Sequence, residues 1–336
     1  MISNGSAAGP PSAAPPAVAD GRSLGERIVG TAVGDLVYMA IITVFALCVP
    51  LLLVLLLWEV GLAAWPAFRQ FGFGFLTSSD WDPVHLNFGA APAIFGTLVS
   101  SLIALVIATP LAVGVAIYLS EYAPRWLLQP LAFFVDLLAA IPSVVYGLWG
   151  IFVLVPLLRA YVMPFLRDTL HLGATPFFSG PMYGPSMLAA GLILSIMVLP
   201  YISSVSREVL LAVPRSQREA ALALGATRWE MIQKTVLPYT KSGIIGGIIL
   251  GLGRALGETM AVTMLIGNSP KISASLLAPG YTMASVIANE FSEATGDLHR
   301  AALMAVGFVL LVLTLVVNAL ARWLVWQVGR SGAVTR

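Results

Sequence analysis

The chain has 336 residues, of which 58% are hydrophobic and only 10% are charged, and its mean hydropathy is +0.91. Soluble domains typically carry about 25% charged residues, so this composition excludes a water-soluble globular fold and indicates a membrane protein. The formal net charge of +2 is too small to favour a nucleic-acid partner, and the single cysteine, Cys48, excludes an intrachain disulfide.

The N-terminal segment is rich in Pro, Ala, Gly and Ser and contains no long apolar run. Such a segment buries too little apolar surface to offset the entropy lost on ordering, so residues 1–30 are predicted to form a disordered cytoplasmic tail. The first apolar run is long and lies far from the start, which predicts a retained helix instead of a cleaved signal peptide. Residues 31–330 are predicted to form one transmembrane domain.

Six apolar stretches follow, each long enough for a helix that crosses the bilayer, which takes about 20 residues. They cover residues 36–58, 93–119, 130–158, 186–206, 242–267 and 301–326. The third is long for one span, and Ile141-Pro142-Ser143 within it predicts a kink. The expected fold is therefore an all-α polytopic membrane protein with six transmembrane helices.

The distribution of cations predicts the orientation of these helices. With the N-terminus inside, 12 of the 18 Lys and Arg residues fall in cytoplasmic segments and 5 fall outside, while Arg254 lies within a span. Short cytoplasmic loops of membrane proteins carry an excess of Lys and Arg. The bias therefore predicts that both termini and the loop at 207–241 are cytoplasmic.

The cytoplasmic loop has the pattern of two short helices joined at a glycine. The run SQREAALALGA, from Ser216, reads as a helix that ends at Gly225, whose missing side chain permits a left-handed cap. A second helical segment is predicted at roughly 229–236 and runs to Leu237-Pro238 at the membrane. A helix–glycine–helix elbow of this kind can transmit a movement from a cytoplasmic partner into the following transmembrane helix.

The same loop resembles the EAA signature of ABC-importer permease subunits. The residues at the family spacing are Glu219, Ala220, Ala221, Gly225, Leu237 and Pro238, whereas Thr235 stands where the family usually has isoleucine. The resemblance implies that the first short helix docks into a groove of a separate ATPase subunit. The alternative is an ordinary amphipathic loop at the membrane interface.

The chain itself has no site for nucleotide hydrolysis. A P-loop needs a lysine directly after glycine, and none of Lys234, Lys241 and Lys271 follows one. The chain is therefore predicted to be no enzyme and to bind no cofactor, with ATP and Mg²⁺ held by a partner ATPase.

Two charged residues, Arg254 and Glu258, lie in the fifth apolar stretch. A charge inside a bilayer costs from about 3 to about 10 kcal/mol or more, so such residues usually face a pathway or a polar seam. Their i, i+4 spacing predicts one helix face, where they partly neutralise each other. Arg254 is predicted to line the route of an anion, because its planar donors suit phosphate, with Glu258 holding it. The alternative is a staple between two helices.

Glycines recur at intervals of four in the same stretch, at Gly243, Gly247 and Gly251. Small residues at this spacing allow close helix crossing and favour a position at a subunit seam. Asp136 is predicted to serve in helix packing or capping. The other polar residues are interpreted as surface groups and not metal ligands, namely His85, His171, His299, and an outer acidic face of Glu290, Glu293 and Asp297.

Four segments closely resemble the PstC-type permease subunit of the phosphate-specific ABC importer. They are GLGRALGETMAV and residues 119–124, 136–154 and 206–227, and the resemblance runs from about Phe95 to the last helix. It implies the type I ABC importer permease fold in a bacterial plasma (inner) membrane. The implied partners are a PstA-type permease in a heterodimer, a PstB-type ATPase dimer and an extracytoplasmic phosphate-binding protein.

Three other functions remain open from the sequence. One is an ABC permease for another oxyanion, such as sulfate or molybdate. Another is an ion-coupled secondary carrier or channel, which would work without an ATPase and would carry an internal inverted repeat that the sequence does not show. The third is a membrane scaffold without transport, in which Arg254 and Glu258 would affect assembly only.

Overall fold

The computed structural model describes residues 24–331. The chain divides into two compact units, residues 1–56 and 57–336. Most of the predicted tail, residues 1–23, lies outside the described residues, and α1 already begins at Leu24, inside the range assigned to that tail.

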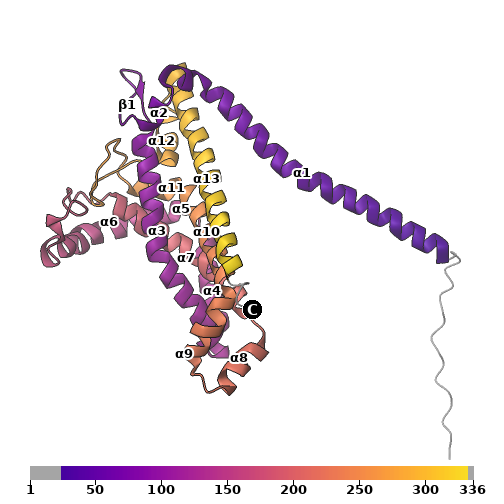
Figure 1. Ribbon diagram of the computed structural model, residues 1–336. Helices are drawn as coiled ribbons and strands as arrows, with labels where there is room; N and C mark the ends of the chain where they lie inside the picture. The colour runs from indigo at the N-terminus through magenta and orange to yellow at the C-terminus, as the bar shows by residue number, and fades with distance from the viewer. Residues whose placement is uncertain (1–23, 332–336) are drawn as a thin grey trace, which may run out of the picture. The chain divides into compact units, whose positions relative to one another are not determined.

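The described residues form a predominantly helical chain (Figure 1). The long helices are α1 (Leu24–Phe71), α3 (Ala91–Ile117), α4 (Arg125–Ala140), α7 (Met187–Leu211), α10 (Leu237–Leu256) and α13 (Asp297–Ser331). The short ones are α2 (Gly74–Thr77), α5 (Ser143–Trp149), α6 (Val155–Leu157), α8 (Arg215–Ala223), α9 (Arg228–Met231), α11 (Met260–Leu265) and α12 (Met283–Glu290). Two strands, β1 (Trp81–Asp82) and β2 (Asn87–Phe88), pair antiparallel.

Within the described residues, six helical segments are long and apolar enough to cross a membrane. They are Gly34–Phe71, Ala91–Tyr122, Ser143–Thr169, Met187–Leu211, Arg228–Leu256 and Asp297–Gln327. The predicted number of spans is confirmed, and each segment overlaps its predicted counterpart. Several of these segments are completed by turns with π-type hydrogen bonding, for example Tyr118–Tyr122 and Ile232–Val236.

The third span differs from its prediction. The chain breaks completely between α4 and α5, because Ile141 and Pro142 both adopt extended backbone angles. A proline pushes the preceding residue out of the helical region, which accounts for the break. The spanning segment is therefore Ser143–Thr169, and α4 is a separate, shorter apolar helix.

Helix α7 is the centre of the second unit and packs against both α3 and α10. The α3 surface carries buried alanines at four-residue intervals: Ala104, Ala108, Ala112 and Ala116. The glycine stripe of α10 also lies on α7, since side chains of Val209, Val205 and Val198 would meet a β-carbon at positions 243, 247 and 251 respectively. The predicted subunit seam is thus a contact within one chain, where small residues allow the helices to approach closely.

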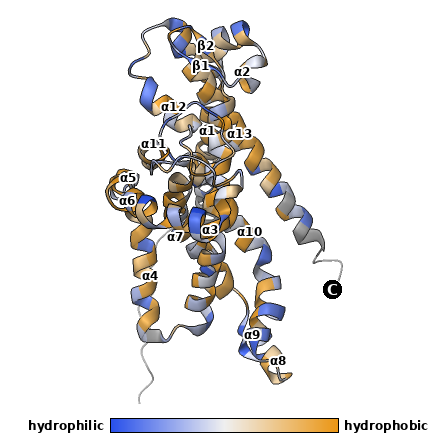
Figure 2. Cartoon of the chain, turned by 90° about the vertical axis from the view of Figure 1, so that its left-hand side faces the viewer, coloured by the Kyte–Doolittle hydropathy of each residue, from blue (hydrophilic) through white to orange (hydrophobic). Residues whose placement is uncertain are grey.

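Polar elements gather at the two ends of the second unit. The β1–β2 hairpin, α2 and α12 lie at one end, and α8 and α9 lie at the other (Figure 1). Figure 2 shows hydrophobic residues over most of the spanning helices and hydrophilic residues concentrated in the end regions, notably at α9. The spans thus separate two water-facing ends, and the charged pair of the fifth span lies between them.

Candidate functional site

Arg254 and Glu258 form the predicted ion pair. Arg254 Nη1 lies 2.5 Å from Glu258 Oε2. The two side chains differ in environment, because that of Glu258 is only 2% exposed and that of Arg254 is 35% exposed. The carboxylate therefore holds the guanidinium from the buried side.

The spacing predicted that the pair lies on one continuous helix, but the structure shows a break between the two residues. Helix α10 ends at Leu256, and Glu258 lies in a short break before α11. Its second oxygen, Oε1, accepts a hydrogen bond from the Ala261 backbone amide at 3.3 Å, at the start of α11. Broken helices inside a membrane need such partners for their freed backbone groups, and they occur where the chain lines a cavity.

Arg254 lines a groove of about 900 Å³ between α10 and α13. The lining side chains come from α7 (Tyr201), α10 (Gly246, Ile249, Leu250, Gly253 and Arg254) and α13 (Leu315, Asn318, Ala319, Arg322 and Val325). Glu258 is not among them, so the structure places it behind Arg254 and not in the groove itself. Its place is that of a positioning residue.

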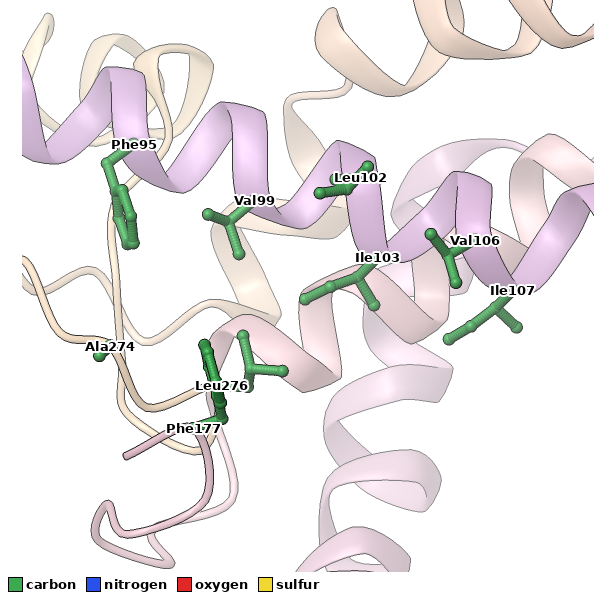
Figure 3. Close-up of a pocket in the computed structure, with 9 residues that line it drawn as sticks. All are labelled: Phe95, Val99, Leu102, Ile103, Val106, Ile107, Phe177, Ala274 and Leu276. Carbon is green, nitrogen blue, oxygen red and sulfur yellow. The ribbon is translucent and has the colours of Figure 1, made fainter. Parts of the chain in front are cut away.

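Two other grooves on the second unit are lined only by apolar side chains. One, of about 540 Å³, lies along α3, where Phe95 and Ile103 are among the side chains opposite Phe177 and Leu276 (Figure 3). The other, of about 350 Å³, lies along α13 and is completed by Phe68, Leu76 and Ile94. An apolar lining offers no donor to an anion, so of these three grooves the one at Arg254 is the candidate for a polar substrate.

The elbow predicted in the cytoplasmic loop is confirmed in its geometry. Gly225 has a φ of +87°, in the left-handed region. Its amide donates to the Leu222 carbonyl at 3.0 Å, and the Ala226 amide donates to the Ala221 carbonyl at 3.2 Å. This pair of bonds is the Schellman motif that ends many helices. Helix α9 then starts with a capping box of Thr227 and Glu230.

Glu219 and Ala220 are exposed on α8, while Ala221 is half-buried against the protein. Leu224 at the tip of the elbow is 89% exposed. An exposed face of this kind, with small residues and an apolar tip, is available to another protein. The coupling role of these residues remains a prediction.

Sequence reasoning missed Glu121, which anchors α8. Arg218 donates from Nη2 to Glu121 Oε1 at 2.9 Å and to the Leu210 carbonyl at 2.7 Å, and from Nη1 to the Val213 carbonyl at 2.6 Å. Both charged side chains are largely buried. Helix α8 is thereby fastened to the ends of the second and fourth spans. The only sequence signal was the position of Glu121 in the LSEYAP run that closes the second span.

The path from the elbow into the membrane has no interruption at Leu237-Pro238. The helical segment runs from Arg228 to Leu256. A π-type turn at Ile232–Val236 precedes Pro238, which sits in the first turn of α10, where its missing amide is tolerated. A displacement of α9 is therefore carried directly into α10.

Two interpretations are wrong at the end of the unit that carries the β1–β2 hairpin. Glu290 is not part of a solvated face: its carboxylate accepts hydrogen bonds from Trp81 Nε1 at 2.8 Å and Tyr281 Oη at 3.1 Å. His299 is not a surface residue, because its Nε2 lies 3.0 Å from Glu290 Oε2 and its ring stacks on Phe88.

Other polar residues remain at the surface. Glu293 and Asp297 are exposed, in agreement with the solvated face, and so are His85 and His171. Asp136 is also exposed, inside α4 and not at its end, so the predicted packing or capping role is wrong. A hydrogen bond from His85 lowers the pKa of Asp82. Within residues 24–331, no group of three or more His, Cys, Asp or Glu residues could hold a metal ion.

Comparisons with known proteins agree with this architecture. Residues 108–329 match the binding-protein-dependent transport system inner membrane component family. The phosphate transport system permease protein PstC of Mesorhizobium japonicum is 48% identical over 273 residues, which is 80% of this chain and 84% of that one. PstC of Xylella fastidiosa is 50% identical, covering 77% and 81%. PstC of Pasteurella multocida is 46% identical, covering 85% and 90%.

Two solved structures share the fold. A chain of a bacterial ABC transporter involved in the import of the acidic polysaccharide alginate aligns with a TM-score of 0.52 and 20% identity, over 90% of this chain and 99% of that one. A chain of the inward-facing MetNI methionine ABC transporter aligns with a TM-score of 0.50 and 17% identity, over 70% and 94%. The predicted type I ABC importer permease fold is confirmed. The chain belongs to the family of binding-protein-dependent transport system inner membrane components, and within it to the PstC-type permeases.

Proposed function

We propose that this chain is the transmembrane permease subunit of an ATP-driven importer of inorganic phosphate and forms half of its translocation path. The observation that carries the proposal is Arg254, a guanidinium that a buried carboxylate holds at the wall of a groove within otherwise apolar spans. Arginine binds phosphate oxygens through paired N–H groups of fixed geometry. The identity of 46–50% to three PstC permeases supports phosphate over other oxyanions.

As a permease of this family the chain is not an enzyme, and ATP is hydrolysed by a separate subunit. The partners we propose are a PstA-type permease that completes the path, a PstB-type ATPase dimer that binds ATP and Mg²⁺, and an extracytoplasmic phosphate-binding protein. The chain spans the membrane several times, and we propose the bacterial plasma (inner) membrane with both termini in the cytoplasm. The excess of Lys and Arg on one side of the spans supports this orientation.

The proposed mechanism is alternating access driven through the elbow. The exposed face of α8 docks on the ATPase, and closure of the ATPase dimer displaces α8. Because α9 and α10 form one helical path, the displacement reaches Arg254 near the far end of α10. Movement of α10 against α13 then opens or closes the groove that Arg254 lines.

The test is transport by the purified four-component system in proteoliposomes, with ATP supplied on the ATPase side. We expect uptake of labelled phosphate that depends on ATP and on the binding protein, with little uptake of sulfate or molybdate at equal concentration. Preferential uptake of sulfate or molybdate would overturn the substrate. Phosphate uptake driven by an ion gradient without the ATPase would overturn the class of transporter.

A further inference from the structure

The groove that begins at Arg254 carries a second guanidinium, that of Arg322 on α13. Position 253 of α10 lies beside Asn318, whose Oδ1 is 3.9 Å from where a β-carbon on Gly253 would stand. From there the lining continues to Gly246 on α10 and to Arg322 and Val325 on α13. Arg254 and Arg322 thus line the same groove, whereas the Asn318 side-chain amide donates from Nδ2 to the Thr314 carbonyl at 2.8 Å.

The course of the groove follows from the directions of α10 and α13. Gly246 comes seven residues before Gly253, about 10 Å closer to the elbow end of α10, and Arg322 comes four residues after Asn318, about 6 Å along α13. Helix α13 starts at the hairpin end of the unit and runs toward the end that carries α8 and α9 (Figure 1). Both displacements therefore point the same way, and the groove leads from Arg254 toward the elbow.

The environment of the two guanidinium groups differs along this direction. Arg254 is paired with a buried carboxylate, whereas within residues 24–331 no ion pair includes Arg322, whose side chain is exposed. The attraction between opposite charges weakens as the surroundings become more water-like. Arg322 lies only five residues before the elbow-side end of the last span at Gln327, about 8 Å along the helix. An anion held there is closer to water than an anion at Arg254, which favours its release.

We infer that Arg322 forms a second anion-binding site, which receives a tetrahedral oxyanion from Arg254 and releases it on the elbow side. The inference rests on the proposed function, under which the anion is phosphate. A transport path needs several sites, each attractive enough to be entered and weak enough to be left. The competing role of Arg322 is that of an interfacial anchor beside Trp323 and Trp326, with no contact to the substrate.

The first test measures phosphate uptake per assembled complex in proteoliposomes that contain the whole transporter. We expect Arg322→Gln to lower the uptake rate about tenfold and Arg322→Lys to retain most of it, because lysine keeps the charge. Lys241→Gln is the matched control, since it removes a cation from α10 at a position that does not line the groove. Normal uptake per complex with Arg322→Gln, whether or not less protein inserts, would identify an anchor and overturn the inference.

The second test reads binding without transport. In the Cys48→Ser background, a cysteine at Ala319, an exposed lining residue between Asn318 and Arg322, is labelled with a small neutral thiol reagent from the cytoplasmic face. We expect phosphate to slow the labelling and chloride at equal ionic strength not to, and we expect the protection to vanish with Arg322→Gln. Equal protection with and without Arg322 would overturn the site while the phosphate transporter stands. Protection by sulfate in place of phosphate would support the site and overturn the proposed substrate.

Discussion

Glu258 and Arg254 have unequal places in their ion pair, and this difference decides how the pair is tested. The carboxylate is buried and also accepts a hydrogen bond from the Ala261 amide in the first turn of α11, while the guanidinium borders the groove. Removing one partner of a buried pair leaves an uncompensated charge and costs about 3–5 kcal/mol, whereas replacing both is often neutral. A single Arg254 variant therefore mixes a loss of stability with a loss of substrate contact.

The double variant Arg254→Gln/Glu258→Gln separates the two effects. Without a stranded charge we expect the complex to assemble at normal levels and to retain ATPase activity. If Arg254 contacts the passing anion, phosphate uptake stays at background; if the pair only balances charge, uptake returns. Uptake and ATP hydrolysis are measured on the same proteoliposomes. Recovery of uptake in the double variant would remove Arg254 from the path.

Glu290 is the second residue whose environment allows a prediction. Burial raises the pKa of Tyr281 to about 12, so its hydroxyl keeps its proton and continues to donate to the carboxylate at neutral pH. Trp81 donates to the same carboxylate from a position 209 residues away. The acceptor thus ties the β1–β2 hairpin to α12.

Glu290→Gln should loosen the contact between the hairpin and α12, because the amide nitrogen replaces an acceptor and leaves at least one donor unpaired. An unsatisfied buried donor costs about 1–3 kcal/mol. We expect faster hydrogen exchange at residues 81–88 and at the start of α13, together with a lower melting temperature. Glu293→Gln, which alters an exposed carboxylate on the same segment, serves as the control and should change neither. Equal hydrogen-exchange rates in the two variants would show that Glu290 does not hold the hairpin against α12.

At the scale of elements, the elbow is rigid for identifiable reasons. Arg218 joins α8 to Glu121 and to the last carbonyls of α7, and the turn between α8 and α9 is closed by backbone bonds at Gly225 and Ala226. Helix α8 is therefore fixed to the spans near its start and to α9 at its end. A force on α8 is transmitted, instead of being absorbed by a flexible loop.

Gly225→Val and Gly225→Asn form a pair that tests this rigidity. No atom lies within 4 Å of a β-carbon built at Gly225, so space is not limiting, and only the φ of +87° distinguishes the two substitutions. A left-handed conformation costs most residues about 1–2 kcal/mol and is readily adopted by asparagine. We expect Val to lower phosphate uptake per ATP hydrolysed several-fold and Asn to keep it near normal. Normal phosphate uptake per ATP hydrolysed in the Val variant would show that a rigid elbow is not needed for coupling.

At the scale of the whole molecule, the sequence predicted what depends on local pattern. Hydropathy alone located six spans, and the cap chemistry at Gly225 located the elbow. The third span was misjudged because Pro142 was interpreted as a kink within one helix, whereas Ile141 leaves the helical region and α4 ends before it. The break after Leu256 was missed because an i, i+4 pair fits a continuous helix equally well.

Contacts between residues far apart in the chain could not be predicted from the sequence. Glu290 was interpreted as one of three exposed acidic residues, because no residue near it in the sequence indicates that Trp81 donates to it. Glu121 was one polar residue in a run that closes a span, and its partner Arg218 lies 97 residues later. The glycines of α10 marked a close helix crossing, but the identity of the crossing helix, α7, came only from the fold.

The orientation of the molecule yields the last prediction. If the elbow end is cytoplasmic, a cysteine at Ala220 in the Cys48→Ser background should cross-link to the ATPase and react with an impermeant reagent only in inside-out vesicles. A cysteine at Ser292, exposed at the opposite end, should react only in intact cells. Ala220 is exposed and Ala221 half-buried, so Ala220→Cys should cross-link more efficiently than Ala221→Cys. Cross-linking to the ATPase from Ser292 and not from Ala220 would reverse the topology and transfer the coupling role to the outer loops.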